Sequence, residues 1–237
     1  MKRVVLWLLA LALVAGFVRA GLWQSGRADE KEALLARAAT VLSERRPVPL
    51  EKARSAMPAW VQLEGSFLDL PPLRLDNQRR GERVGVHVYR AFETNQGRRL
   101  MVDLGWRPLP GDRALPSEPP LPEAKLSLRG LLVPPPSAGF AMGPALSPAK
   151  DGGWLALRLD PASLRSALDR PSESALPEVL DSAVLRLDPT LALGYERDLD
   201  LLPNTLPPEK HRGYALQWFG FAVGLLLLSL YLQLRRL

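Results

Sequence analysis

The sequence contains no cysteine and only two histidines, His87 and His211. The absence of cysteine excludes disulfide bonds, thiol nucleophiles and cysteine metal sites. The small number of histidines argues against a histidine-rich metal centre. The chain also lacks a GxSxG motif, an HExxH motif and a phosphate-binding glycine loop, and its carboxylates are scattered. We therefore expect a protein that is not an enzyme.

A continuous basic stripe is also missing, although the pI is about 10.0. All 25 acidic residues, and all but five of the 31 basic ones, lie between Gln24 and Arg212. The remaining basic residues lie in or near the two ends of the chain. A nearly neutral middle with basic tips is typical of membrane topology and argues against a nucleic-acid partner.

The C-terminal segment has the composition of a membrane span. Residues 214–234 carry no charge, and 21 helical residues cover about 31 Å, the thickness of a bilayer core. The N-terminal segment is less decisive, because Val4 to Val18 is short for a span and Val18-Arg19-Ala20 resembles a signal-peptidase site. From the residues alone, a retained anchor and a cleaved signal peptide are equally good interpretations.

Basic residues outside both apolar segments predict that both termini are cytoplasmic and that the middle of the chain is periplasmic, in a bacterial inner membrane. The expected division is a cytoplasmic N-terminus (1–3), a first transmembrane helix (4–23), a periplasmic domain (24–212), a second transmembrane helix (213–234) and a cytoplasmic C-terminus (235–237). Gly220 and Gly224 have the GxxxG spacing that lets helices approach closely in lipid. The partner of this face is either the first helix of the chain or a helix of another protein.

The middle of the chain predicts an α+β fold that is mainly β. Residues 29–46 have the pattern of an amphipathic helix that ends before Pro47. Asn95-Gln96-Gly97 predicts a hairpin turn, a short helix fits 161–168, and the proline-rich stretches 116–122 and 134–148 are expected to be loops. Alternating apolar residues predict a barrel or sandwich with strands at 59–68, 84–92, 98–106, 124–133, 154–159 and 179–187.

Three motifs together resemble the Surfeit locus protein 1 family, in its bacterial form. Gly21, Trp23, Gln24, Arg27 and Lys31 match a GxWQ…R…K signature that follows the first transmembrane helix of that family. The segment 102–108 resembles its VNRGWxP strand and contains Gly105 and Trp106, with Asp103 and Leu104 in place of Asn and Arg. The segment 207–219 is similar to its PxxH…YAxxW entry to the second helix. Gly65 and Gly130 fit strand glycines of the family.

The resemblance implies that the first apolar segment is retained as an anchor. It also implies a function, which is assembly of a haem-copper terminal oxidase by helping haem a reach, or remain in, catalytic subunit I. The expected partners are cytochrome c oxidase subunit I, haem a synthase and membrane lipids. The competing interpretation is a generic envelope scaffold, anchored twice, that binds protein partners without haem.

Two groups of residues are candidates for this function. His211, Tyr214 and Trp218 share a helix face, so His211 is a candidate transient ligand of the haem iron, the two aromatic rings could pack on the macrocycle, and Arg212 could meet a propionate. Residue types alone favour the simpler interpretation that such residues mark the membrane surface. The second group is a candidate partner surface and contains Trp23, Gln24, Arg27 and Lys31.

Four further residues are expected to be structural: Gly65 and Gly130 permit close backbone approach, and Gly105 and Trp106 belong to the core. His87 is expected to be a surface strand histidine.

Overall fold

The computed structural model describes residues 2–115, 118–136, 143–159, 180–201 and 205–235. The chain forms two compact units, one made of residues 1–37 and 205–237 and the other of residues 38–204. The predicted arrangement of two terminal helices flanking a β domain is confirmed as a fold. The predicted helix at 161–168 lies outside the described residues.

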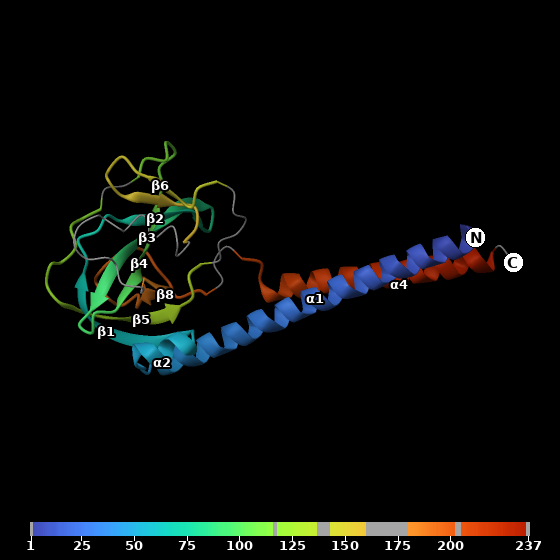
Figure 1. The fold of residues 1–237 in the computed structure, drawn as a ribbon, viewed down its shortest axis with the longest axis horizontal. Coiled ribbons are helices and arrows are strands. Elements are labelled where there is room, and N and C mark those ends of the chain that lie inside the picture. Colours follow the sequence, from blue (N-terminus) through green and yellow to red (C-terminus); the bar gives the residue numbers. More distant parts are fainter. Residues whose placement is uncertain (1, 116–117, 137–142, 160–179, 202–204, 236–237) are drawn as a thin grey trace. The chain divides into compact units, whose positions relative to one another are not determined.

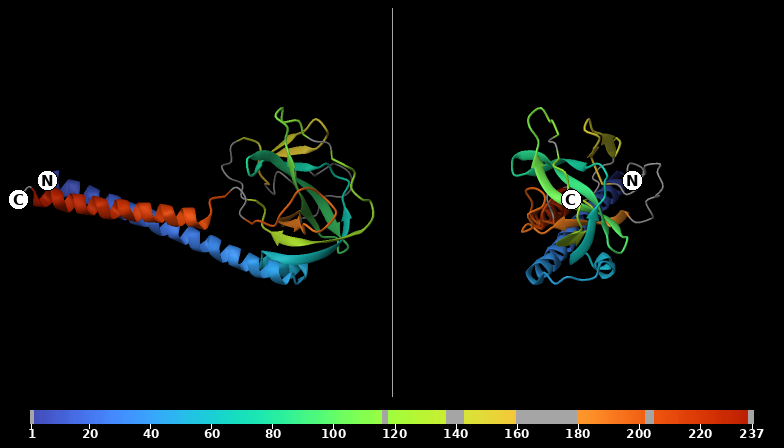
Figure 2. Two further views of the ribbon diagram at one scale, coloured as in Figure 1. Left: turned by 180° about the vertical axis from the view of Figure 1, so that it is seen from behind. Right: turned by 90° about the vertical axis from the view of Figure 1, so that its left-hand side faces the viewer.

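The first unit is a pair of long helices. Helix α1 (Lys2–Glu44) and helix α4 (Pro208–Leu234) lie side by side and run antiparallel (Figures 1 and 2). The side chain of Trp7 donates to Gln233 near the two chain ends, and Lys31 donates to the carbonyl oxygen of Leu206 at the other end. Both helices are long and apolar enough to cross a membrane.

The apolar surfaces of this pair are largely uncovered. Only 6% of the apolar window of α1 and 11% of that of α4 are buried, whereas the core helix of a soluble protein would be mostly covered. Leu8, for example, is 62% exposed. Such surfaces are stable in hydrocarbon and costly in water.

One continuous helix replaces the two predicted at 4–23 and 29–46. Gly21 and Gly26 do not interrupt α1. It ends at Glu44, two residues earlier than predicted, because Arg45 adopts a left-handed conformation (φ 45°) and donates its N–H to the carbonyl of Val41, a common helix C-terminus.

The second unit is a mixed β-sheet with one short helix, α2 (Leu50–Ser55). Its strands are β1 (Ala59–Phe67), β2 (Leu73–Arg80), β3 (Arg83–Thr94), β4 (Arg99–Pro108), β5 (Leu126–Val133), β6 (Leu146–Pro148), β7 (Trp154–Ala156) and β8 (Leu180–Leu187). The sheet order is β1-β5-β8-β4-β3-β2-β7-β6, and an additional β1–β3 pairing closes the first five strands into a barrel. The sheet continues beyond β3 through β2, β7 and β6 (Figure 1).

Long stretches of β4 and β5 are buried on both faces, which explains the apolar runs in their sequences, whereas β1 exposes Gln62 and Glu64. Successive residues alternate between two core clusters: Trp60 packs in one and Val61 in the other, and Leu131 and Leu132 divide in the same way. Each fully buried aliphatic side chain contributes about 1.5–3 kcal/mol.

The predicted strands are present with end shifts of up to three residues, and the turn at 95–97 connects β3 to β4 as expected, with Gly97 at φ 74°. Two strands, β2 and β6, were not predicted. The expected loop 134–148 therefore ends in a short strand.

Candidate functional site

His211 lies in the first turn of α4 and points toward α1. Pro207 and Pro208 fix the start of this helix, as prolines do at a helix N-terminus. The His211 side chain packs against α1 within the helix pair, and the residue is only 7% exposed. Its Nδ1 lies 2.6 Å from Oε1 of Gln24. The helix pair therefore brings together two residues that are 187 positions apart in the sequence.

This hydrogen bond indicates which ring nitrogen carries a hydrogen. The amide oxygen of Gln24 can only accept, so Nδ1 carries the hydrogen and donates it. In the neutral ring, Nε2 then keeps its lone pair. Among the described residues, no hydrogen bond is found at Nε2. An imidazole that donates through one nitrogen and offers the other is the usual form of a metal-binding histidine.

Small residues allow the two helices to approach closely beside this hydrogen bond. Ala28 is fully buried and Ala215 is 4% exposed. A Cβ atom added at Gly21 would lie 2.6 Å from the ring of Phe219, so only glycine fits there without a shift. The Trp218 ring stacks on Phe17 at a centroid distance of 5.8 Å. Trp218 thus packs within the helix pair, about two turns beyond His211.

Charged residues surround the same end of the helix pair. Arg212 contacts both oxygens of Glu32, at 2.8 and 2.6 Å, and lies 3.5 Å from Asp29. Arg27 pairs with Glu30 at 2.5 Å, and Lys31 donates to a backbone carbonyl. Arg212, the candidate for a haem propionate, is therefore already held by acidic side chains, although its own side chain remains 57% exposed.

Several candidates do not join this cluster. Tyr214 is 43% exposed and Trp23 is 60% exposed, so neither packs in the helix interface with His211. The shared face of His211, Tyr214 and Trp218 stays a prediction. Nothing among the described residues lies within 4 Å of a Cβ added at Gly220 or Gly224. The GxxxG pair consequently does not face α1.

The glycines expected to be structural have the predicted role. A Cβ at Gly65 would overlap the backbone carbonyl of Glu93, and one at Gly130 would overlap that of Arg186. Gly105 has a φ of 114°, which other residues rarely adopt. Trp106 is 1% exposed and donates its Nε1–H to the carbonyl of Gln78 at 3.0 Å.

His87 lies on a strand, β3, as expected, but it is largely covered and has a carboxylate partner. Its Nδ1 lies 3.0 Å from both carboxylate oxygens of Asp103, and its side chain is 14% exposed. Sequence reasoning missed this pair because the two residues lie on neighbouring strands whose register is not visible in the sequence. The one available signal was Asp103 itself, a charged residue in an apolar strand.

The donor set for a resident metal ion is small. Within the parts of the chain that the structure describes, no three His, Asp or Glu side chains gather closely enough to hold one. A single imidazole from His211, with its other nitrogen fixed by Gln24, still fits one axial ligand of a haem iron.

The comparison with protein families agrees with the motifs, whereas the comparison with curated proteins finds no match. Among protein families, the SURF1 family matches residues 11–223, which include most of α1, the first part of α4 and the whole β domain. The chain therefore belongs to the SURF1 family.

Proposed function

We propose that this protein is a membrane-anchored, non-enzymatic assembly factor that assists haem a delivery to, or retention in, subunit I of a haem-copper oxidase. Members of the SURF1 family are generally assembly factors for cytochrome c oxidase. The haem step, the partner subunit and a contact with haem a synthase are the specific parts of the proposal. His211 is the proposed transient ligand.

The hydrogen bond from His211 to Gln24 carries this proposal. It joins two of the three motifs of the family resemblance, and it leaves Nε2 as the nitrogen available for a ligand. A haem iron binds a neutral imidazole nitrogen as an axial ligand, and fixing the other nitrogen orients the ring before the ligand arrives. Trp218, already stacked on Phe17, supplies an aromatic surface farther along the same helix.

Arg212 is the proposed contact for a propionate. Its ion pairs with Glu32 and Asp29 are exposed, and exposed pairs contribute little to stability. An arriving carboxylate can therefore replace one of them at small cost.

The placement in the membrane is also a proposal. Because α1 and α4 run antiparallel, both chain ends lie at one end of the helix pair and His211 lies toward the other. Phe17 and Trp7, from the first apolar segment, contact α4, which supports a retained anchor. With the basic tips in the cytoplasm, His211 and the β domain would face the periplasm.

Spectroscopy of the purified full-length protein tests the haem proposal. The protein is co-expressed with haem a synthesis and extracted in detergent. We expect haem absorbance in the unchanged protein and its loss in His211→Ala. His87→Ala is the matched control, since the chain has only these two histidines, and it should keep the haem. A full haem spectrum in His211→Ala would contradict the proposal.

A generic scaffold is the second candidate, and the 7% exposure of His211 favours it, because the bond to Gln24 could serve only to join the two helices. Affinity purification of the tagged protein distinguishes the assembly factor from the generic scaffold. The assembly factor should bring down oxidase subunit I or haem a synthase, and a generic scaffold should bring down neither.

A further inference from the structure

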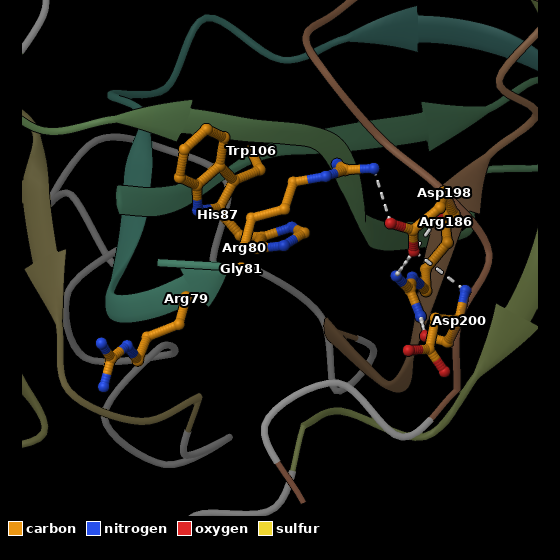
Figure 3. Close-up of a pocket in the computed structure, with 8 residues that line it drawn as sticks. All are labelled: Arg79, Arg80, Gly81, His87, Trp106, Arg186, Asp198 and Asp200. Carbon is orange, nitrogen blue, oxygen red and sulfur yellow. Dashed lines mark hydrogen bonds and ion pairs between the residues drawn. The ribbon is translucent and has the colours of Figure 1, made fainter. Parts of the chain in front are cut away.

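The β domain contains a pocket of about 470 Å³ that the proposed haem function does not use. Its walls come from the end of β2, from β3, β4 and β8, and from the segment that follows β8 (Figure 3). The polar lining residues are three arginines, one histidine and two aspartates: Arg79, Arg80, Arg186, His87, Asp198 and Asp200. Trp106 lines the pocket as well. This volume is within the range of small-molecule sites.

A β-bulge shapes the wall beneath His87. Along the β3–β4 pairing, Val88 opposes Gly105 and Tyr89 opposes Asp103, so Leu104 is an extra residue in β4. Bulges change the direction in which nearby side chains point. The bulge and the unusual φ of Gly105 let the Gly105 N–H donate to the carboxylate of Asp103 at 2.9 Å.

Asp103 fixes the orientation of the His87 ring. Asp103 is 5% exposed and does not line the pocket, whereas His87 does. Nδ1 of His87 is bonded to this carboxylate, so Nε2 is the nitrogen left for the pocket. Burial by itself would raise the pKa of Asp103, but His87, Arg186 and the Gly105 N–H together hold that pKa below its ordinary value. The buried carboxylate is therefore ionised.

The three arginines of the pocket differ in the ion pairs that they form. Arg80 contacts Asp198 at 2.7 Å and Glu196 at 3.1 Å, and Arg186 lies 3.6 Å from Asp198. Arg79, by contrast, forms no ion pair with any residue that the structure describes. Three arginines and two aspartates line the pocket. The neighbouring carboxylates of Glu196 and Asp103 pair with Arg80 and Arg186, so Arg79 is the lining arginine that no described carboxylate offsets.

From this arrangement we propose that the pocket binds a small molecule through a carboxylate or phosphate group, with Arg79 and His87 as the residues that contact it. Arginine presents a planar set of N–H donors that matches the oxygens of both groups. The ring of His87, held by the carboxylate of Asp103 through Nδ1, offers Nε2 as a further polar contact. This proposal is independent of haem binding at His211.

Nuclear magnetic resonance of the full-length protein in detergent tests the proposal, because the chain has only two histidines. The protein is labelled with ¹³C-histidine, and His211→Ala assigns the His87 signal. Inorganic phosphate and acetate are the probes, each titrated at constant ionic strength against chloride. We expect the His87 signal to shift in a saturable way with at least one probe, and the probe that saturates identifies the group.

Two variants with equal charge changes complete the test. Arg79→Gln should weaken the binding about tenfold, the effect of losing a hydrogen bond to a charged group. Arg158→Gln is the control, since Arg158 lies outside the pocket and donates to the carbonyl of Gly143, and it should bind as the parent does. The proposal would be overturned by an equal loss of binding in both variants or by an equal response of the His87 signal to chloride. It would also be overturned if no saturable shift occurred at about 10 mM probe, which is ten times a dissociation constant of 1 mM.

Discussion

Replacing Gly21 with valine should separate α1 from α4 next to the bond between Gln24 and His211. A Cβ at this position would lie 2.6 Å from Phe219, whereas carbon atoms in ordinary contact are about 3.5–4.0 Å apart. The overlap is thus about 1 Å before the γ-methyl groups of valine are counted. Overpacking of this kind costs about 1–3 kcal/mol, which shifts the pairing equilibrium about 5- to 150-fold.

Gly26→Val is the matched control for this prediction. Gly26 lies in the same helix, and a Cβ there would meet nothing within 4 Å. Both substitutions change helix propensity by the same amount, so the difference between them isolates the clash. Gln24 is one turn from Gly21, so the Gly21 variant should also lose its contact with His211.

Electron–electron distance measurements can detect the separation. The chain has no cysteine, so spin labels on Leu9→Cys and Leu232→Cys, both exposed residues, are unique. Gly21→Val should lengthen and broaden the distance distribution between the labels, and Gly26→Val should leave it unchanged. The same distribution in both variants would refute the reasoning.

Three other changes have defined outcomes. Gly65→Ala should lower the free energy of unfolding by about 1–3 kcal/mol, since its Cβ would overlap a neighbouring strand, and urea titration should show no such loss for Gly111→Ala, where the space is open. Because the pKa of Asp103 is lower in the folded protein, its contribution is present above the unfolded pKa of about 4 and is lost as the pH falls through the folded value. Asp103→Asn should therefore reduce the loss of thermal stability on acidification. Arg212→Gln should leave the melting temperature unchanged, because its contacts are exposed, yet lower haem retention in a spectroscopic titration; unchanged retention would contradict the propionate role.

Local pattern predicted much of the β domain. Among the strands that were found, β4 and β5 have apolar residues in successive positions, which reflects burial on both faces. Strand β2 was missed because it contains Asp76, Asn77, Arg79 and Arg80, and its polar side chains resemble a loop. Closure of the barrel through the β1–β3 pairing could not be predicted, since strand partners depend on contacts between distant residues.

The candidate site shows the same division between local and distant information. The motifs placed Gln24 and His211 among the candidates, but their 2.6 Å contact requires the antiparallel pairing of the two helices. Spacing along the helix pointed to Gly220 and Gly224 as a packing face, whereas the tight contact between the two helices involves Gly21. Which side of a helix faces its neighbour depends on the rotation of both helices, and a sequence pattern of small residues does not define it.

The most direct test of the central claim is the haem content of the terminal oxidases in a strain that lacks this protein. If the protein assists haem a delivery or retention, membranes of that strain should contain subunit I with reduced haem a and reduced oxidase activity, and the unchanged gene should restore both while His211→Ala should not. Oxidase with normal haem content and activity in the deletion strain would contradict the account.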